Sequence, residues 1–214
     1  MEELLKMPIV GIVRNMSMDD FREILPVYIE VGLTNIEVTL NTPGALEMIK
    51  YANHEYGNKL VAGAGTVCDL EDLRKALNAG AKFIVTPITD ITVIEECTIQ
   101  EIPVFPGAFT ASEIYQAWKA GASMVKVFPA GSVGPNYIKD IKGPLNQVKL
   151  MPTGGVDLLN ILDFFKAGAS AVGIGGKLFD PTLVNEKKWK ELFQHFSAFV
   201  KFINDFNSTM KNPS

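Results

Sequence analysis

Short apolar stretches alternate along the chain with segments in which apolar residues recur every three or four positions. Continuous apolar stretches are typical of parallel strands buried on both faces, and the wider spacing is typical of helices with one buried face. The strands predicted in this way are 9–14, 31–38, 60–67, 79–85, 104–108, 120–127, 148–153 and 167–174. The predicted helices are 18–31, 45–54, 70–79, 91–99, 111–120, 134–142, 158–167 and 185–206.

Four of these strand segments share one internal repeat, a turn of small residues followed by an apolar run. The repeats are 31–38, 79–85, 120–127 and 167–174. Each carries a glycine at its second position, which suits the residue after a helix, where a positive φ angle is common. Each repeat therefore marks the end of one helix and the start of the next strand.

Strict alternation of strands and helices with short connections predicts a parallel sheet. Eight such units favour closure, and we expect an α/β fold, a single (β/α)8 TIM barrel. An open doubly wound sheet is the alternative, but the first strand ends in Gly11-Ile12-Val13-Arg14-Asn15 without a GxGxxG pattern. No shift in composition divides the chain, so we expect one domain over 1–214 with a C-terminal amphipathic helix.

Composition narrows the classes of partner. The formal net charge of -4 over 214 residues gives no electrostatic reason to expect nucleic acid or an anionic membrane. No apolar run approaches the roughly 18 residues of a membrane helix, and 1–10 lack the apolar core of a signal peptide. Cys68 and Cys97 form no CxxC pattern, and no residue cluster has metal-ligand spacing. We therefore expect a cytoplasmic protein without a bound metal.

One lysine interrupts a stretch that is expected to be a buried strand. Lys126 lies within 122–130, which reads Ala-Ser-Met-Val-Lys-Val-Phe-Pro-Ala. Burial disfavours the charged ammonium, and a neutral amine can attack a carbonyl to form a Schiff base. The alternative is an edge strand whose lysine side chain reaches water. We interpret Lys126 as a candidate covalent catalyst.

Glu37 is a second charged residue in an apolar strand, between Ile36 and Val38. A desolvated carboxyl has a raised pKa and can exchange protons near neutral pH. The alternative is a structural ion pair with Lys126 or Arg14, which is compatible with a catalytic role. A glutamate and a lysine that share one barrel interior favour a catalytic pair.

Polar residues and glycines gather at the carboxyl ends of the predicted strands, where barrel enzymes hold their sites. The pairs 154–155 and 175–176 follow the last two strands, where backbone N–H groups can bind a phosphate. Tight turns are the alternative for either pair. Lys177 adds a positive charge to such a pocket, or else it is a solvated turn residue. Arg14 can grip a carboxylate or phosphate through its planar guanidinium, or else it lies free on the surface.

Five short segments occur together in the order found in one enzyme family. They are 37–40 (Glu-Val-Thr-Leu), 63–67 (Gly-Ala-Gly-Thr-Val), 125–130 (Val-Lys-Val-Phe-Pro-Ala), 152–156 (Pro-Thr-Gly-Gly-Val) and 175–176 (Gly-Gly). With these segments the chain resembles the KDPG/KHG aldolases over about 8–179. These are class I aldolases that act on 2-keto-3-deoxy-6-phosphogluconate (KDPG) and 4-hydroxy-2-oxoglutarate (KHG).

The resemblance implies a homotrimeric barrel that needs no cofactor and releases pyruvate from a phosphorylated keto acid. Lys126 matches the Schiff-base lysine and Glu37 the general acid/base of the family. Thr66 and Arg14 lie where the family holds the pyruvate carboxylate. The other matching substrate positions are Pro87 and Phe128 in the pocket wall, Thr153 beside it, and Gly154, Gly155, Gly175 and Gly176 in the phosphate loops.

Two positions depart from the family pattern. Many members read EVTLRT after the glutamate strand, and their arginine helps to bind the substrate, whereas this chain has Asn41. The related aldolases for 2-keto-3-deoxy-6-phosphogalactonate (KDPGal) also carry asparagine there and resemble this chain over 134–139. Lys177 stands where serine often follows the glycines of the phosphate loop. KDPG is the expected substrate, KHG a second one, and KDPGal the alternative.

Two other classes of function fit part of the pattern. A phosphosugar isomerase or epimerase on the same barrel shares the phosphate loops but needs no lysine nucleophile in the sixth strand. A barrel that only binds a sugar phosphate needs neither Glu37 nor Lys126, so the presence of both argues against it.

Overall fold

The computed structural model describes residues 2–211, so the predicted domain limits at 1 and 214 lie outside the described residues. The strands are β1 (Ile9–Val13), β2 (Asn35–Thr39), β3 (Val61–Gly65), β4 (Ile84–Val85), β5 (Val104–Phe105), β6 (Gly107–Ala108), β7 (Val125–Val127), β8 (Leu150–Pro152) and β9 (Val172–Ile174). The helices are α1 (Glu2–Lys6), α2 (Met18–Glu30), α3 (Ala45–Tyr56), α4 (Leu70–Asn78), α5 (Ile91–Ile99), α6 (Ala111–Lys119), η1 (Ala130–Ser132), α7 (Gly134–Lys142), α8 (Ile161–Lys166), α9 (Pro181–Asn185) and α10 (Trp189–Lys211).

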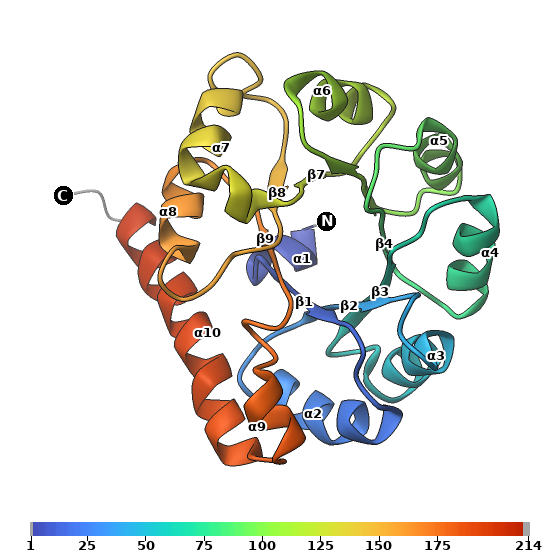
Figure 1. Ribbon diagram of the computed structural model, residues 1–214, viewed down its shortest axis with the longest axis vertical. Helices are drawn as coiled ribbons and strands as arrows, with labels where there is room; N and C mark the ends of the chain where they lie inside the picture. Colours follow the sequence, from blue (N-terminus) through green and yellow to red (C-terminus); the bar gives the residue numbers. More distant parts are fainter. Residues whose placement is uncertain (1, 212–214) are drawn as a thin grey trace.

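The strands form two parallel sheets instead of one closed sheet. Six strands pair in the order β5-β4-β3-β2-β1-β9, and three pair in the order β6-β7-β8. Helices surround the strands on the outside, as Figure 1 shows. The prediction of a closed eight-stranded (β/α)8 TIM barrel is therefore wrong, and the fold is a distorted α/β barrel.

Proline lies at both places where the ladder is interrupted. Pro106 divides the predicted strand 104–108, so that β5 pairs with β4 while β6 pairs with β7. Proline donates no hydrogen bond and fixes its φ angle, which disrupts a continuous ladder. At the second gap, β8 ends at Pro152, and a single bridge from Thr153 to Gly173 links it to β9.

The four-fold repeat has the predicted structure. Its glycines follow α2, α4, α6 and α8 and precede β2, β4, β7 and β9. Their φ angles are all positive, at 92° for Gly32, 85° for Gly80, 107° for Gly121 and 100° for Gly168. A side chain is disfavoured in this conformation, so glycine ends each helix at a fixed position.

A cluster of large apolar side chains fills the barrel near the amino ends of the strands. The rings of Phe83 and Phe105 stack with centroids 5.4 Å apart, and Met124 and Met151 pack in the same cluster. Leu4 of α1 joins the cluster, and α1 projects onto the ring of strands in Figure 1. This apolar floor leaves the carboxyl ends of the strands as the open side of the barrel.

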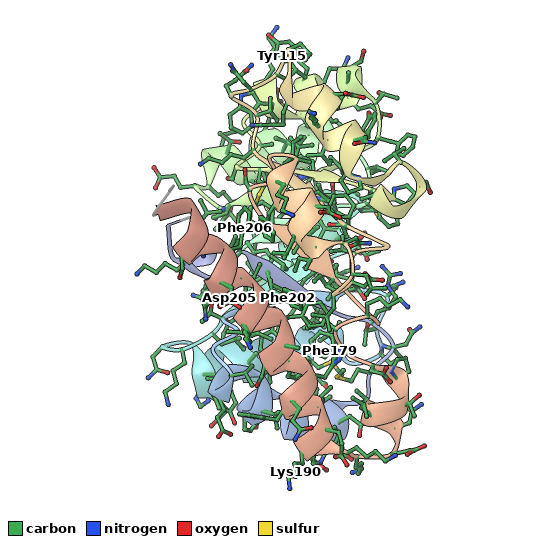
Figure 2. The ribbon with its side chains drawn as sticks, turned by 90° about the vertical axis from the view of Figure 1, so that its left-hand side faces the viewer. Tyr115, Phe179, Lys190, Phe202, Asp205 and Phe206 are labelled. Carbon is green, nitrogen blue, oxygen red and sulfur yellow. The ribbon has the colours of Figure 1, made fainter. Side chains whose placement is uncertain are left out.

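The helix predicted over 185–206 corresponds to α10, which begins at Trp189, and the short helix α9 before it was not predicted. The short α9 ends at Asn185, and α10 then runs along the side of the barrel against α2 and α8 (Figures 1 and 2). Lys187 between them has a positive φ of 52°, which no helix accommodates. The buried face of α10 consists of Leu192, Phe196, Phe199 and Ile203.

Tyr28 of α2 connects this outer layer to the sheet. Its ring stacks on Phe179 and meets the edge of Phe196. Its buried hydroxyl donates a hydrogen bond to the carbonyl of Asn35 at 2.6 Å and accepts one from the N–H of Gly11 at 3.2 Å.

Over residues 2–211, no helix combines the length and apolar character needed to cross a membrane.

We expect Tyr28→Phe to destabilise the fold by about 1–3 kcal/mol, because it leaves the buried Gly11 N–H and Asn35 carbonyl without this partner. Denaturant unfolding followed by circular dichroism measures the loss. Tyr115→Phe is the matched control, since that ring is 48% exposed, and it should change stability by less than about 0.5 kcal/mol. Equal effects of the two variants would contradict the role of the hydroxyl.

Candidate active site

Glu37 and Lys126 enter the barrel interior from different sheets. Glu37 is the central residue of β2, and Lys126 is the central residue of β7, on the opposite side of the ring in Figure 1. Both residues are buried, with relative exposures of 1% and 5%. Two ionisable groups therefore share one desolvated space above the apolar floor.

Burial dominates the electrostatics of Glu37. Desolvation raises the pKa of its carboxyl, and the positive charges of Lys126 and Arg14 oppose that rise. Its Oε2 atom is buried and has no hydrogen-bond partner among the described residues. A buried carboxyl with one unpartnered oxygen is costly to ionise, so Glu37 holds a proton more readily than a carboxyl in water.

Lys126 responds to burial in the opposite sense. Desolvation lowers the pKa of its amine, the carboxylate of Glu37 opposes this change, and the charge of Arg14 reinforces it. Its Nζ lies 5.1 Å from the centroid of the Phe128 ring, within range of a cation–π contact. The lowered pKa gives Lys126 a larger fraction of neutral, nucleophilic amine at neutral pH than a solvated lysine has.

A hollow opens beside these residues at the carboxyl ends of β1, β8 and β9. It has a volume of about 210 Å³. The structure brings eight of the predicted site residues together in its wall, namely Arg14, Phe128, Thr153, Gly154, Gly155, Gly175, Gly176 and Lys177. The two predicted phosphate loops thus face one space, together with a guanidinium and an ammonium group.

The glycine loop after β8 is held by close backbone packing. Gly154 and Gly155 have φ angles of 83° and 79°. The N–H of Gly131 donates a hydrogen bond to the Gly154 carbonyl at 2.7 Å. A Cβ on Gly155 would lie 2.6 Å from the Cα of Gly131, so this loop accepts no larger residue. The Phe128 ring lies beside Gly154 and also lies near the amine of Lys126, so it stands between the lysine and this loop.

Thr66 follows β3 in a strained conformation. Its φ angle is 59°, in the left-handed region that a β-branched residue rarely adopts. Such outliers persist where the surrounding structure fixes them, and they cluster at functional sites. The sequence motif indicates Thr66 as a site residue, but the strain is visible only in the structure.

Besides Glu37 and Lys126 in the barrel interior, three predicted site residues lie outside the wall of the hollow. Thr66, Asn41 and Pro87 all stand in loops at the carboxyl ends of strands, after β3, β2 and β4 respectively. The Asn41 side chain is exposed. The neighbouring Thr42 hydroxyl accepts a hydrogen bond from the N–H of Asn15 at 3.1 Å, which ties this loop to the end of β1.

Sequence reasoning missed Ile12 as a wall residue. Ile12 lines the hollow together with Arg14, two positions further along the chain. Side chains two positions apart in a strand point to the same face, so the prediction for Arg14 carried the signal for Ile12 as well.

Comparison with known proteins identifies the family of this fold and site. The family model described as KDPG and KHG aldolase matches residues 1–195. The 2-dehydro-3-deoxy-6-phosphogalactonate aldolase of Escherichia coli (strain K12) is 32% identical, over 92% of this chain and 94% of that protein. The 2-dehydro-3-deoxy-phosphogluconate aldolase of Haemophilus influenzae is 33% identical, over 89% of this chain and 90% of that protein.

A solved structure with the same arrangement contains a reaction intermediate. It is the KDPG aldolase from Legionella pneumophila with pyruvate captured as a covalent carbinolamine. It superposes with a TM-score of 0.84 at 25% identity, over 90% of this chain and 94% of that one. The chain described here belongs to the KDPG and KHG aldolase family.

Proposed function

We propose that this protein is a class I aldolase, a lyase that cleaves KDPG to pyruvate and glyceraldehyde 3-phosphate through a Schiff base on Lys126. One observation carries the proposal. A buried lysine with a lowered pKa and a buried glutamate with a raised pKa share the barrel interior, beside a hollow lined by two glycine loops.

The first step is attack of the neutral Lys126 amine on the C2 ketone of the keto acid. Loss of water from the resulting carbinolamine gives an iminium ion, which accepts electrons from the bond to be broken. Burial favours the neutral amine before attack, so the enzyme need not operate at alkaline pH. The pyruvate carbinolamine of the Legionella relative is the corresponding intermediate in that protein.

Glu37 transfers the protons in the second step. Its carboxylate accepts the proton of the C4 hydroxyl, the C3–C4 bond breaks, and glyceraldehyde 3-phosphate leaves. The protonated Glu37 then returns a proton to C3 of the enamine, and hydrolysis of the iminium frees pyruvate. One residue can both accept and return the proton because burial raises the pKa of its carboxyl above that of a solvated glutamate.

The remaining predicted residues orient the substrate. Arg14 and Thr66 hold the carboxylate of the keto acid near Lys126. The backbone of the two glycine loops, together with Lys177, holds the remote phosphate in the hollow. Binding energy from this distant group positions the reacting carbons and so assists the chemical step.

KDPGal is the alternative substrate, and Asn41 is the observation that favours it. Relatives of this chain carry both activities in their names. Asn41 is exposed at the open end of β2, where it is free to contact the hydroxyl groups of a bound substrate. KHG is the third candidate, and it differs from the other two in having no phosphate for the glycine loops to bind. Comparing kcat/KM for KDPG, KDPGal and KHG ranks the three.

The proposal includes a homotrimer in the cytoplasm that binds neither nucleic acid nor membranes. Exposed apolar side chains on and beside α5 support an assembly, and they include Ile88, Ile91 and Ile99. The negative net charge argues against an acidic polymer as partner. Light scattering after size-exclusion chromatography measures the mass of the assembly.

Trapping with borohydride tests the role of Lys126. Incubation with pyruvate and borohydride should attach one reduced pyruvate to Lys126, and peptide mass spectrometry locates it. Lys126→Met should form no adduct and lose activity by more than about 10³-fold. Lys142→Met is the matched control, because burial lowers the pKa of Lys142 as well, although it lies outside the hollow. An adduct on any lysine other than Lys126 would overturn the mechanism.

Replacement of Glu37 tests proton transfer. Glu37→Gln should lower kcat by about 10²- to 10⁴-fold, because the amide cannot accept or return a proton. The wild-type kcat/KM should fall at acidic pH through two groups, Glu37, whose carboxylate accepts the hydroxyl proton, and Lys126, whose neutral amine attacks the ketone. Glu37→Gln should keep the Lys126 step of this acidic limb and lose the Glu37 step, so the limb should become less steep.

Glu95→Gln serves as the control for this experiment, because Glu95 is exposed on the outer helix α5. It should keep the wild-type rate and pH profile. A Glu37→Gln enzyme with an unchanged acidic limb would show that another group makes the transfer.

A further inference from the structure

The side chain of Glu37 on β2 reaches toward Gly65 on the neighbouring strand β3. β2 and β3 run in parallel, with Glu37 beside Gly63 and Thr39 beside Gly65. A Cβ placed on Gly65 would lie 1.8 Å from Oε1 of Glu37, 2.4 Å from its Cδ and 2.6 Å from its Cγ. Three atoms of the glutamate side chain thus occupy the space that any other residue at Gly65 would fill.

Backbone conformation does not explain this glycine. Gly65 ends strand β3, where its carbonyl accepts a hydrogen bond from the N–H of Leu40 at 2.8 Å. Its φ angle lies outside the positive range that favours glycine, unlike those of Gly154 and Gly155. The requirement at Gly65 is therefore one of space, and the group that fills the space is the carboxyl of Glu37.

A second glycine of the same strand has a different neighbour. Gly63 lies two residues earlier, so it points to the same face of β3 as Gly65. A Cβ there would lie 2.5 Å from the ring of Phe83, in the apolar floor. Gly63 makes room for the core, whereas Gly65 makes room for an ionisable group.

We propose that Gly65 is a positioning residue for the aldol reaction, because its missing side chain forms the recess that fixes the carboxyl of Glu37. The proposal rests on the proposed role of Glu37 in proton transfer. Steric fit matters at this point because no hydrogen bond within residues 2–211 holds Oε2. A side chain at position 65 would push the carboxyl out of the recess, away from the place where it meets the substrate.

Gly65→Ala tests the recess through the rate and its pH dependence. A displacement of about 1 Å in a catalytic group can cost about 10²-fold in rate, and we expect kcat to fall by at least that factor. The displaced carboxyl should be better solvated, so the Glu37 step in the acidic limb of kcat/KM should move to lower pH. Lys126 should still form the reduced pyruvate adduct, because the recess does not touch it.

Gly63→Ala is the matched control, since it makes the same change on the same face of the same strand. It should lower thermal stability through its contact with Phe83 while the acidic limb keeps its wild-type position. A Gly65→Ala enzyme whose limb does not move, like that of Gly63→Ala, would overturn the positioning role. Failure of the wild-type protein to form the adduct would instead overturn the proposed function.

A double-mutant cycle with Glu37→Ala adds an independent test. Alanine at position 37 lacks the Cγ, Cδ and Oε1 atoms that crowd the place of the added Cβ, so Gly65→Ala should lower the thermal stability of Glu37→Ala by much less than that of the wild type. An equal loss in both backgrounds would contradict the steric link. If Gly65→Ala fails to fold, the variant Gly65→Ala/Glu37→Ala decides the question. It should fold if the clash is with Glu37, and continued failure to fold would assign the clash to another group.

Discussion

The structure depends on the burial of two ionisable side chains, Glu37 and Lys126, inside one barrel. Taking a charge out of water costs several kcal/mol unless other groups compensate for it. Here the cost moves the two pKa values toward each other, upward for the carboxyl and downward for the amine. A stable protein gains little from such a pair, but an enzyme that needs a neutral amine and a proton carrier at one place gains both.

The fold accommodates this pair by an arrangement of large and small side chains. Phe83 and Phe105 close the barrel below the pair, and Gly65 leaves room for the carboxyl beside it. The glycine loops after β8 and β9 leave backbone groups facing the hollow. The same interior is therefore closed by apolar side chains at one end and opens into the hollow at the other.

Much of this arrangement follows from the sequence. The order of strands and helices and the turn glycines of the repeat could be predicted, because hydrophobic spacing and positive φ angles are local properties. Closure of the barrel could not, because it depends on how strands only two or three residues long pair across Pro106 and after Pro152. The short helix α9 could not be predicted because its five residues are too few to show a helical period.

The features of the site likewise divide into those that the sequence predicts and those that it does not. Lys126 and Glu37 are visible in the sequence as charges in apolar runs, and the glycine pairs mark the loops. The role of Gly65 is not visible, since it arises from the register between β2 and β3 and from the rotamer of one glutamate. The strain at Thr66 and the exposure of Asn41 likewise depend on loop geometry.

The proposed chemistry depends most on the pKa of Lys126, which burial lowers. Nuclear magnetic resonance of protein labelled with ¹³C at the lysine ε carbons measures it directly, with the Lys126 signal assigned by its loss in Lys126→Met. The signal should titrate at lower pH than those of the solvent-exposed lysines. A Lys126 signal that titrates together with the exposed lysines would show that burial does not lower the pKa of Lys126.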